Sequence, residues 1–474
     1  MGLIIKNGNI ITSQNEFTAD ILIEGEKIVA IGKDLDTRGH EVVDARGKYV
    51  FPGGVDEHLH YNSFNSLGYE TSHAALVGGT TTVGDFVVQP EGVSLTDSIR
   101  NYKRDYVDGK ASPDYVLHGI VMDPCEETIA DIVNLPSVGV AACKLFMAYK
   151  GMPYYVTDEW LFKALVESKK AGVTIMVHAE NADVIDILTK KLVAEGKTEP
   201  KYFSESRPVL TEAEATSRAI YMAKMADAPL FVVHVTNQLA AEAIRDAYNE
   251  GYSIYGETCT HYLMLNDENL AKPNFEGAKY VCNPPLRPQS DVDFMWEAIN
   301  KGWLKAVSSD HCAIIGGFEK GKKKGLNDFS KIPPGSPGVQ ERLYMMWTYG
   351  VEEGKISRQK FVEVCCTNPA KICGIYPQKG EIAVGSDADI VVFDPNYRGT
   401  ISIKDSLSGS DYCTYEGFEQ KGIAEKVFLR GKLVAENGKF VGEPGQGKQV
   451  MAKAYAYCYE NFKEKKEERL ATNE

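Results

Sequence analysis

The chain has 474 residues and a formal net charge of -14 at pH 7. This acidic balance argues against nucleic acid or an anionic membrane as the main partner, because both are negatively charged. No apolar run reaches membrane-spanning length and the first residues lack the layout of a signal peptide, so we expect a cytoplasmic protein. The 10 cysteines form no CxxC pair, and we expect them to be reduced and without a redox role.

Short β-rich runs with hairpin turns occur near both ends of the chain and not in its middle. Examples are Leu3–Thr12 and Ala19–Ile31 at one end, and Ile390–Phe393 at the other. The economical interpretation is one small β-sandwich domain built from residues 1–50 and 376–445. Residues 446–474 form a C-terminal extension, for which we expect a helix or a flexible segment.

Residues 51–375 alternate strand-like apolar runs with helical patterns such as Asp158–Lys170 and Glu212–Met225. This alternation is the βα signature, and it predicts an α/β fold with eight parallel strands in a (β/α)8 (TIM) barrel. The predicted strands are Tyr49–His60, Thr80–Val88, Tyr115–Met122, Ala141–Tyr149, Val173–His178, Leu230–Thr236, Ser253–Tyr262 and Leu304–Asp310. In such a barrel the chemistry lies at the carboxyl ends of the strands.

Chemically capable side chains gather at those strand ends. Side chains two apart on a strand share a face, so His58 and His60 can point at one metal ion. Lys144 stands out because a charge is costly inside an apolar run. The residues that the strand-end rule selects are His58, His60, Lys144, His178, His234 and Asp310. Together they predict a metal site on the catalytic face of the barrel.

Each of these residues also has an ordinary structural explanation. A lone histidine is more often a hydrogen-bonded core residue, Asp310 could cap a helix, and Lys144 could pair with a buried acid. Independent accidents should not all fall at strand ends, which favours the metal site. His261 and His311 also lie near strand ends, and we expect them to support the site rather than bind metal.

The number of candidate ligands leaves one or two ions open. Four histidines and one aspartate exceed the needs of one hydrolytic ion and are sparse for two. An ammonium is no ligand, but a lysine that has reacted with CO2 becomes an anionic carbamate that can bridge two ions. Carboxylation would also relieve the burial cost of Lys144 as a cation, and it is a hypothesis at this point.

Several motifs make the chain similar to one enzyme family over nearly its whole length. The most specific are Gly53–His60, Lys144–Gly151, His178–Asn181, Asn283–Arg287, Ser309–Cys312 and Ile332–Gly338. They resemble the dihydropyrimidinase and hydantoinase branch of the amidohydrolase superfamily, the cyclic amidases.

The resemblance implies a binuclear site and a hydrolytic mechanism. One metal would be held by His58, His60 and Asp310, the other by His178 and His234, with carboxylated Lys144 as the bridge. Zinc is the expected metal, although manganese or cobalt would suit the same ligands. A hydroxide between the ions would attack a ring amide of a dihydropyrimidine or 5-substituted hydantoin, giving an N-carbamoyl amino acid. Asp310 would act as general base and then acid, and Tyr149 would donate to the oxyanion.

Substrate binding is where this chain departs from the family pattern. Asn283 stands where relatives commonly have Ser, and Pro334 where they commonly have Asn, although backbone carbonyl contacts survive either change. Asn62 replaces the arginine of dihydroorotases, whereas allantoinases tolerate it. Four apolar residues form either part of a wall facing the ring substituent or ordinary barrel core: Tyr61, Phe64, Leu67 and Phe146.

Other functions stay open. An allantoinase or another purine-breakdown ureide hydrolase is the alternative enzyme, and a non-catalytic scaffold of the same fold is the alternative class. The complete ligand set favours the enzyme. The expected partner is a small cyclic ureide, with no nucleic acid and no membrane. Tails such as residues 446–474 often cross subunits in this family, so a homotetramer or homodimer is expected.

Overall fold

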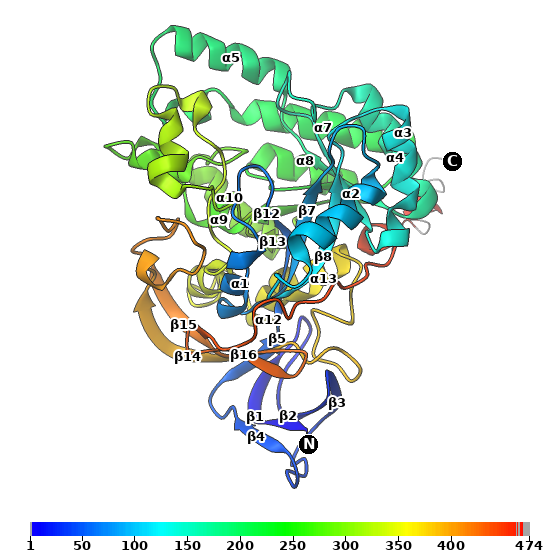
Figure 1. The fold of residues 1–474 in the computed structure, drawn as a ribbon, viewed down its shortest axis with the longest axis vertical. Coiled ribbons are helices and arrows are strands. Elements are labelled where there is room, and N and C mark those ends of the chain that lie inside the picture. The colour runs from blue at the N-terminus through cyan, green and yellow to red at the C-terminus, as the bar shows by residue number, and fades with distance from the viewer. Residues whose placement is uncertain (1, 461, 463–464, 468–474) are drawn as a thin grey trace.

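The computed structural model describes residues 2–460, 462 and 465–467, and Figure 1 shows a barrel with a smaller β-domain beside it. Eight consecutive strands form the barrel sheet and pair in parallel in chain order. They are β6 (Gly54–Leu59), β7 (Thr80–Val88), β8 (Asp114–Ile120), β9 (Ala142–Phe146), β10 (Thr174–His178), β11 (Leu230–Val232), β12 (Ile254–Cys259) and β13 (Ala306–Ser308). The predicted fold class is confirmed.

The barrel closes between its first strand and the segment that follows its last. The amide of Asp310 donates to the carbonyl of His58 at 2.9 Å, and the amide of His60 donates to the carbonyl of His311 at 2.8 Å. These bonds lie at the carboxyl end of β6. Closure therefore fixes the two segments that carry three of the predicted ligands.

Helices surround the barrel, and the two helices predicted by name are present. They are α4 (Asp158–Ala171) and α7 (Val209–Ala226), and α4 ends at Gly172, whose φ of 66° suits glycine. The remaining α-helices are α1 (His73–Val77), α2 (Leu95–Tyr102), α3 (Glu126–Asp131), α5 (Ala182–Ala194), α6 (Tyr202–Glu205), α8 (Gln238–Asn249), α9 (Thr260–Met264), α10 (Gln289–Asn300), α11 (Arg342–Met346), α12 (Arg358–Val362) and α13 (Asn368–Ile372).

Both ends of the chain build the sheet of the smaller domain. Its strands are β1 (Leu3–Ile11), β2 (Glu16–Glu24), β3 (Lys27–Gly32), β4 (Glu41–Asp44), β5 (Tyr49–Pro52), β14 (Ile390–Thr400), β15 (Glu419–Leu429), β16 (Lys432–Glu436) and β17 (Lys439–Phe440). Antiparallel pairing of β5 with β14 joins the two ends. Residues from both halves share one hydrophobic core, for example Ile21 of β2 and Ile390 of β14.

The predicted first barrel strand, Tyr49–His60, is wrong as a single strand. It divides into β5 of the small sheet and β6 of the barrel. The amide of Gly53 donates to the small-domain carbonyl of Asp389, whereas the next amide donates into the barrel. A Cβ at Gly53 would lie 2.1 Å from the Thr81 side chain, so glycine permits the close approach at which the chain changes sheet.

The described part of the C-terminal extension lies against the amino-terminal end of the barrel. The amide of Tyr455 donates to the carbonyl of Gly172 at 2.9 Å, and Cys458 and Tyr459 are buried. Residues 462 and 465–467 are helical, whereas residues 451–456 are irregular. The predicted subunit contact of this extension stays a prediction, and part of it falls outside the described residues.

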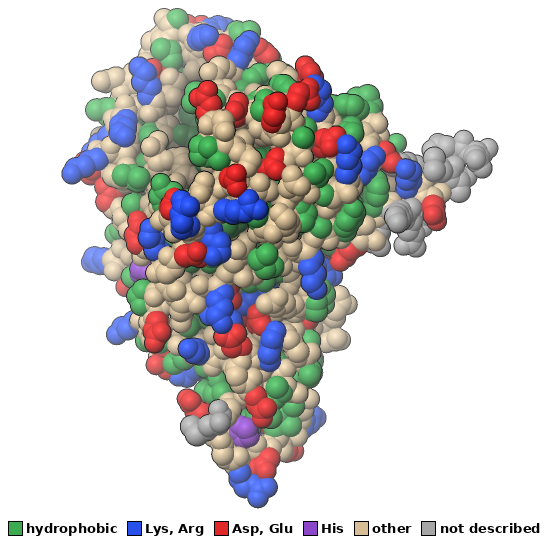
Figure 2. Space-filling model, turned by 45° about the vertical axis from the view of Figure 1, so that its right-hand side comes forward, with side chains coloured by type: hydrophobic (Ala, Val, Ile, Leu, Met, Phe, Trp, Pro, Cys, Tyr) green, Lys and Arg blue, Asp and Glu red, His purple; other side chains and the backbone are tan. Residues whose placement is uncertain are grey.

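The described helices include none with the length and apolar character to cross a membrane. On the face drawn in Figure 2, acidic and basic side chains lie interspersed. The net negative charge is thus spread among lysines and arginines on this face.

A buried ion network ties the barrel to the small sheet. The Nζ atom of Lys379 lies 2.6 Å from Asp114, at the start of β8, and 2.8 Å from Asp389, which precedes β14. Its side chain is 1% exposed, so the charges depend on one another for solvation. Arg430 adds a second cation to Asp114.

We expect Lys379→Met to lower the free energy of unfolding by about 3–5 kcal/mol, because the three buried carboxylates of Asp114, Asp387 and Asp389 lose a cationic partner. Urea unfolding followed by circular dichroism measures the loss. Lys27→Met is the matched control, since Lys27 contacts Asp387 of the same acidic cluster but its side chain is 46% exposed. Equal losses for the two variants would contradict the assigned role of burial.

Candidate metal centre and cavity

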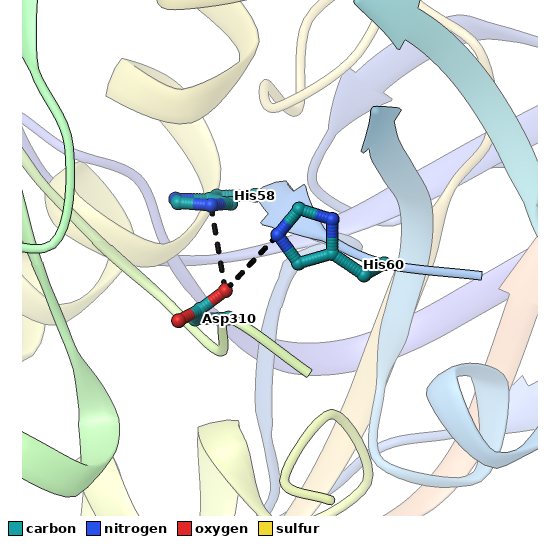
Figure 3. Close-up of side chains that lie close together, drawn as sticks. All are labelled: His58, His60 and Asp310. Carbon is teal, nitrogen blue, oxygen red and sulfur yellow. Dashed lines mark ion pairs between the residues drawn. The ribbon is translucent and has the colours of Figure 1, made fainter. Parts of the chain in front are cut away.

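Two histidines and one aspartate meet where the barrel closes. His58 and His60 come from the end of β6, and Figure 3 shows both rings directed at the carboxylate of Asp310. Their Nε2 atoms lie 3.4 and 3.3 Å from the same Asp310 oxygen. Burial lowers the pKa of His60 to about 4, so the imidazole is neutral and able to bind a cation at pH 7.

Lys144 lies in the same cluster, on β9. Its Nζ atom is 2.8 Å from Nε2 of His58 and faces the rings of Phe86 and Phe146 at 4.6 and 5.2 Å. Burial lowers the pKa of Lys144 to about 8, because an ammonium loses its hydration there. The predicted position of this lysine among the histidines agrees with the structure.

His178 and His234 form a second pair on neighbouring strands. Their ring centroids are 4.5 Å apart, and that of His234 is 5.5 Å from that of His58. Both ring nitrogens of His234 are buried and lack a hydrogen-bond partner among the described residues. Buried polar atoms are normally satisfied, so these nitrogens point to a ligand such as a metal ion.

Two carboxylates that sequence reasoning did not select hold these histidines. Glu257 of β12 lies 2.5 Å from Nδ1 of His58, and Glu180 lies 2.7 Å from Nε2 of His178. Burial opposes ionisation of Glu180, but Arg207 and the His178 hydrogen bond lower its pKa to about 2. Carboxylates behind histidine ligands fix ring orientation in metal sites. The signal for Glu257 was present, since it is a charge inside an apolar strand, as Lys144 is.

The backbone is strained at the same place. Tyr149, His234 and Asp310 have φ angles of 68°, 42° and 44°, and Phe64 has 49°. Side chains other than glycine rarely adopt these angles, and the surrounding fold must compensate for their cost. Such residues cluster at functional sites, which supports the assignment of this region as the site.

A cavity of about 420 Å³ opens onto the cluster. The predicted residues that line it are Phe64, Lys144, Phe146, Tyr149, His178, His234, Asn283, Asp310, Pro334 and His60. The Asn283 amide donates to the Tyr149 hydroxyl at 2.7 Å. Burial raises the pKa of Tyr149 far above its ordinary value, so the phenol stays protonated and able to donate.

Asn62 is not among the residues that line the cavity, although it was predicted to contact substrate. It is exposed, with a φ of 51°, and its side-chain oxygen accepts from the amide of Tyr69 at 3.2 Å. The left-handed turn directs this side chain to its own loop instead of the cavity. Tyr61 and Leu67, the neighbours predicted to extend the apolar wall, also lie outside the lining.

His311 and His261 lie beside the cluster without lining the cavity. Nδ1 of His311 accepts from the amide of Gly338 at 3.1 Å, which anchors the loop after Pro334. His261, Cys259 and Asp310 form a second group of possible ligand atoms near the first.

The donor set fits divalent cations. Neutral imidazoles and a carboxylate are ligands for zinc, manganese or cobalt, and a second shell of carboxylates is in place. His58, His60 and Asp310 have ligand atoms within 4.8 Å of one another, as one ion would require. The arrangement can therefore hold metal at the floor of a cavity large enough for a small ring.

Known proteins resemble this chain over nearly its whole length. The sequence profile described as "Amidohydrolase family" matches residues 49–434. A D-hydantoinase from Ralstonia pickettii is 45% identical, covering 96% of this chain and 100% of that protein. A dihydropyrimidinase from Rattus norvegicus is 37% identical, covering 98% and 91%.

Solved structures agree. The crystal structure of dihydropyrimidinase from Brevibacillus agri NCHU1002 has a TM-score of 0.93 and 42% identity, covering 96% of this chain and 100% of that chain. The resemblance found in the motifs is confirmed: the chain belongs to the amidohydrolase family, in its hydantoinase and dihydropyrimidinase branch.

Proposed function

We propose that the protein hydrolyses a cyclic amide bond of a dihydropyrimidine or 5-substituted hydantoin to an N-carbamoyl amino acid. The observation that carries this proposal is the buried donor cluster at the floor of the cavity, with the Tyr149 hydroxyl beside it. Relatives named D-hydantoinase and dihydropyrimidinase support the same reaction and do not favour allantoin as the ring.

Two metal ions, which we propose to be zinc, complete the site. The first would bind His58, His60 and Asp310, and the second His178 and His234, with carboxylated Lys144 shared between them. When bound, the ions would lower the pKa of water and polarise the ring carbonyl. A carbamate on Lys144 would replace a buried ammonium by an anion facing the metal ions, which removes the cost of burying the cation.

The protein's own groups would move the protons and stabilise the developing charge. Asp310 would accept a proton from the attacking water and return it to the ring nitrogen as the carbon–nitrogen bond breaks. Its position within 3.4 Å of both β6 histidines supports this role. The Tyr149 hydroxyl would donate to the former carbonyl oxygen, and Asn283 would hold that hydroxyl in place.

The cavity wall supports an apolar or aromatic ring substituent. Phe64, Phe146 and Tyr154 pack edge to face, with ring centroids 5.5–6.1 Å apart. Asn283 and Pro334 line the same cavity and would contact the ureide through their backbone. Pro334 can offer only its carbonyl, because proline has no N–H.

A cytoplasmic homotetramer or homodimer is part of the proposal. Four large apolar side chains on α5 and around α7 are more than 60% exposed, which supports burial against another subunit. They are Ile187 (64%), Leu210 (68%), Tyr221 (64%) and Met225 (69%).

A substrate panel with metal analysis tests the proposed function. We expect about two divalent ions per chain and turnover of dihydrouracil, hydantoin or 5-phenylhydantoin, and not of allantoin or dihydroorotate. Liquid chromatography detects the N-carbamoyl product, and a chelator should abolish its formation. Full activity in folded, metal-free protein would refute the two-metal site.

Lys144→Ala should lose metal and activity together, because the proposed bridge is absent. Small carboxylic acids should restore part of the activity by occupying the space of the carbamate. Metal content and kcat are the readouts, and the exposed Lys150→Ala is the control. A fully active Lys144→Ala variant would remove the bridging role.

Tyr149→Phe should lower kcat by about 10²–10³ and leave KM and metal content nearly unchanged, because only an oxyanion donor is lost. Tyr154→Phe is the matched control, since its ring lies 5.4 Å from that of Tyr149 in the same cavity. Similar kcat values for the two variants would show that the Tyr149 hydroxyl does not act on the oxyanion.

A further inference from the structure

Lys322 is a fully buried lysine that the proposed reaction does not use. Its side chain is 0% exposed, and its Nζ atom makes no ion pair with the residues that the structure describes. Burial lowers its pKa to about 7. An amine held in this way costs free energy, so its contacts require an explanation.

Among the described residues, the Nζ atom of Lys322 makes one hydrogen bond, and its acceptor is a carbonyl shared by two segments of the cavity wall. Its Nζ donates to the carbonyl of Val281 at 2.8 Å, and the amide of Gly335 donates to the same oxygen at 3.0 Å. Asn283 follows Val281 by two residues, and Pro334 directly precedes Gly335. Both line the cavity. Lys322 thus holds an oxygen at which the two segments meet.

Further contacts show that these segments are closely fitted. The hydroxyl of Ser336 donates to the carbonyl of Lys279 at 3.1 Å, and the amide of Cys312 donates to the carbonyl of Ser336 at 3.0 Å. Gly335 has a φ of 122°, and a Cβ there would lie 2.8 Å from that of Cys312. A shift of Val281 would therefore be passed to the wall beside Pro334.

We propose that Lys322 is a positioning residue for the ureide ring: by holding the Val281 carbonyl, it sets the spacing between the backbone at Asn283 and at Pro334–Gly335. This inference rests on the proposed function. Pro334 has no N–H to adjust its contacts, so recognition there depends on where the flanking backbone is held.

The test compares Lys322→Met with Lys323→Met in the metal-loaded enzyme. Lys323 is adjacent in the chain, but its Nζ pairs with Glu319 at the surface. We expect Lys322→Met to raise KM about five- to tenfold for both dihydrouracil and hydantoin, with kcat and metal content nearly unchanged. KM should rise by a similar factor for both substrates, because the proposed contacts bind the ureide that they share and not the ring substituent.

The Tm of the variant distinguishes a role of Lys322 in positioning the cavity wall from a role in stabilising the fold. The variant removes a buried amine, and the Val281 carbonyl keeps its bond from Gly335, so its Tm should be unchanged or higher. An unchanged KM, with or without a lower Tm, would overturn the proposal, as would an equal rise in KM for Lys323→Met. Lys322→Leu serves if the first variant does not fold; failure of both to fold would make Lys322 a folding residue and overturn the proposal.

Calorimetric titration of each ring distinguishes this inference from the proposed function. A wild-type enzyme that binds the rings without hydrolysing them would contradict the proposed function alone. The Kd of Lys322→Met relative to that of the wild type would then serve in place of the KM comparison. A wild-type enzyme that binds neither ring would overturn both.

Discussion

The hydrogen bonds that close the barrel between β6 and the segment after β13 place His58 and His60 against Asp310. Donation from the Asp310 amide to the His58 carbonyl fixes both backbones at their strand ends. The remaining donors come from β9, β10 and the end of β11, and closure brings all of these ends around one cavity. A parallel barrel collects such residues without requiring them to be near in sequence.

Burial of so many polar groups costs free energy unless each group has a hydrogen-bond or ion-pair partner, and surrounding side chains supply several of these partners. Glu257 contacts His58 and Glu180 contacts His178. Arg207 in turn donates to Glu180 and balances its negative charge. His234 retains two unsatisfied ring nitrogens among the described residues. These two nitrogens lie among the other candidate ligands, where a cation would bind, which is the pattern of a site prepared for metal.

Individual hydrogen bonds hold the cavity wall in place, in addition to side-chain packing. The Val281 carbonyl joins two wall segments, and the Asn283 amide holds the Tyr149 hydroxyl. Left-handed backbone at Tyr149 and Asp310 adds strain that the surrounding core must balance. Activity would therefore be lost before stability in variants that loosen these contacts.

The sequence by itself determined the barrel, the family and the cluster of His58, Lys144 and Asp310. Strand periodicity and charges in apolar runs are local signals, and a barrel converts strand ends into one face. Only the tertiary structure decided the change of sheet at Gly53, the outward direction of Asn62 and the supporting role of Glu257. The first depends on which backbone passes close to which, and the second on a left-handed turn. The charge of Glu257 inside its strand is a local signal, but its partner His58 lies nearly 200 residues away and leaves no local pattern.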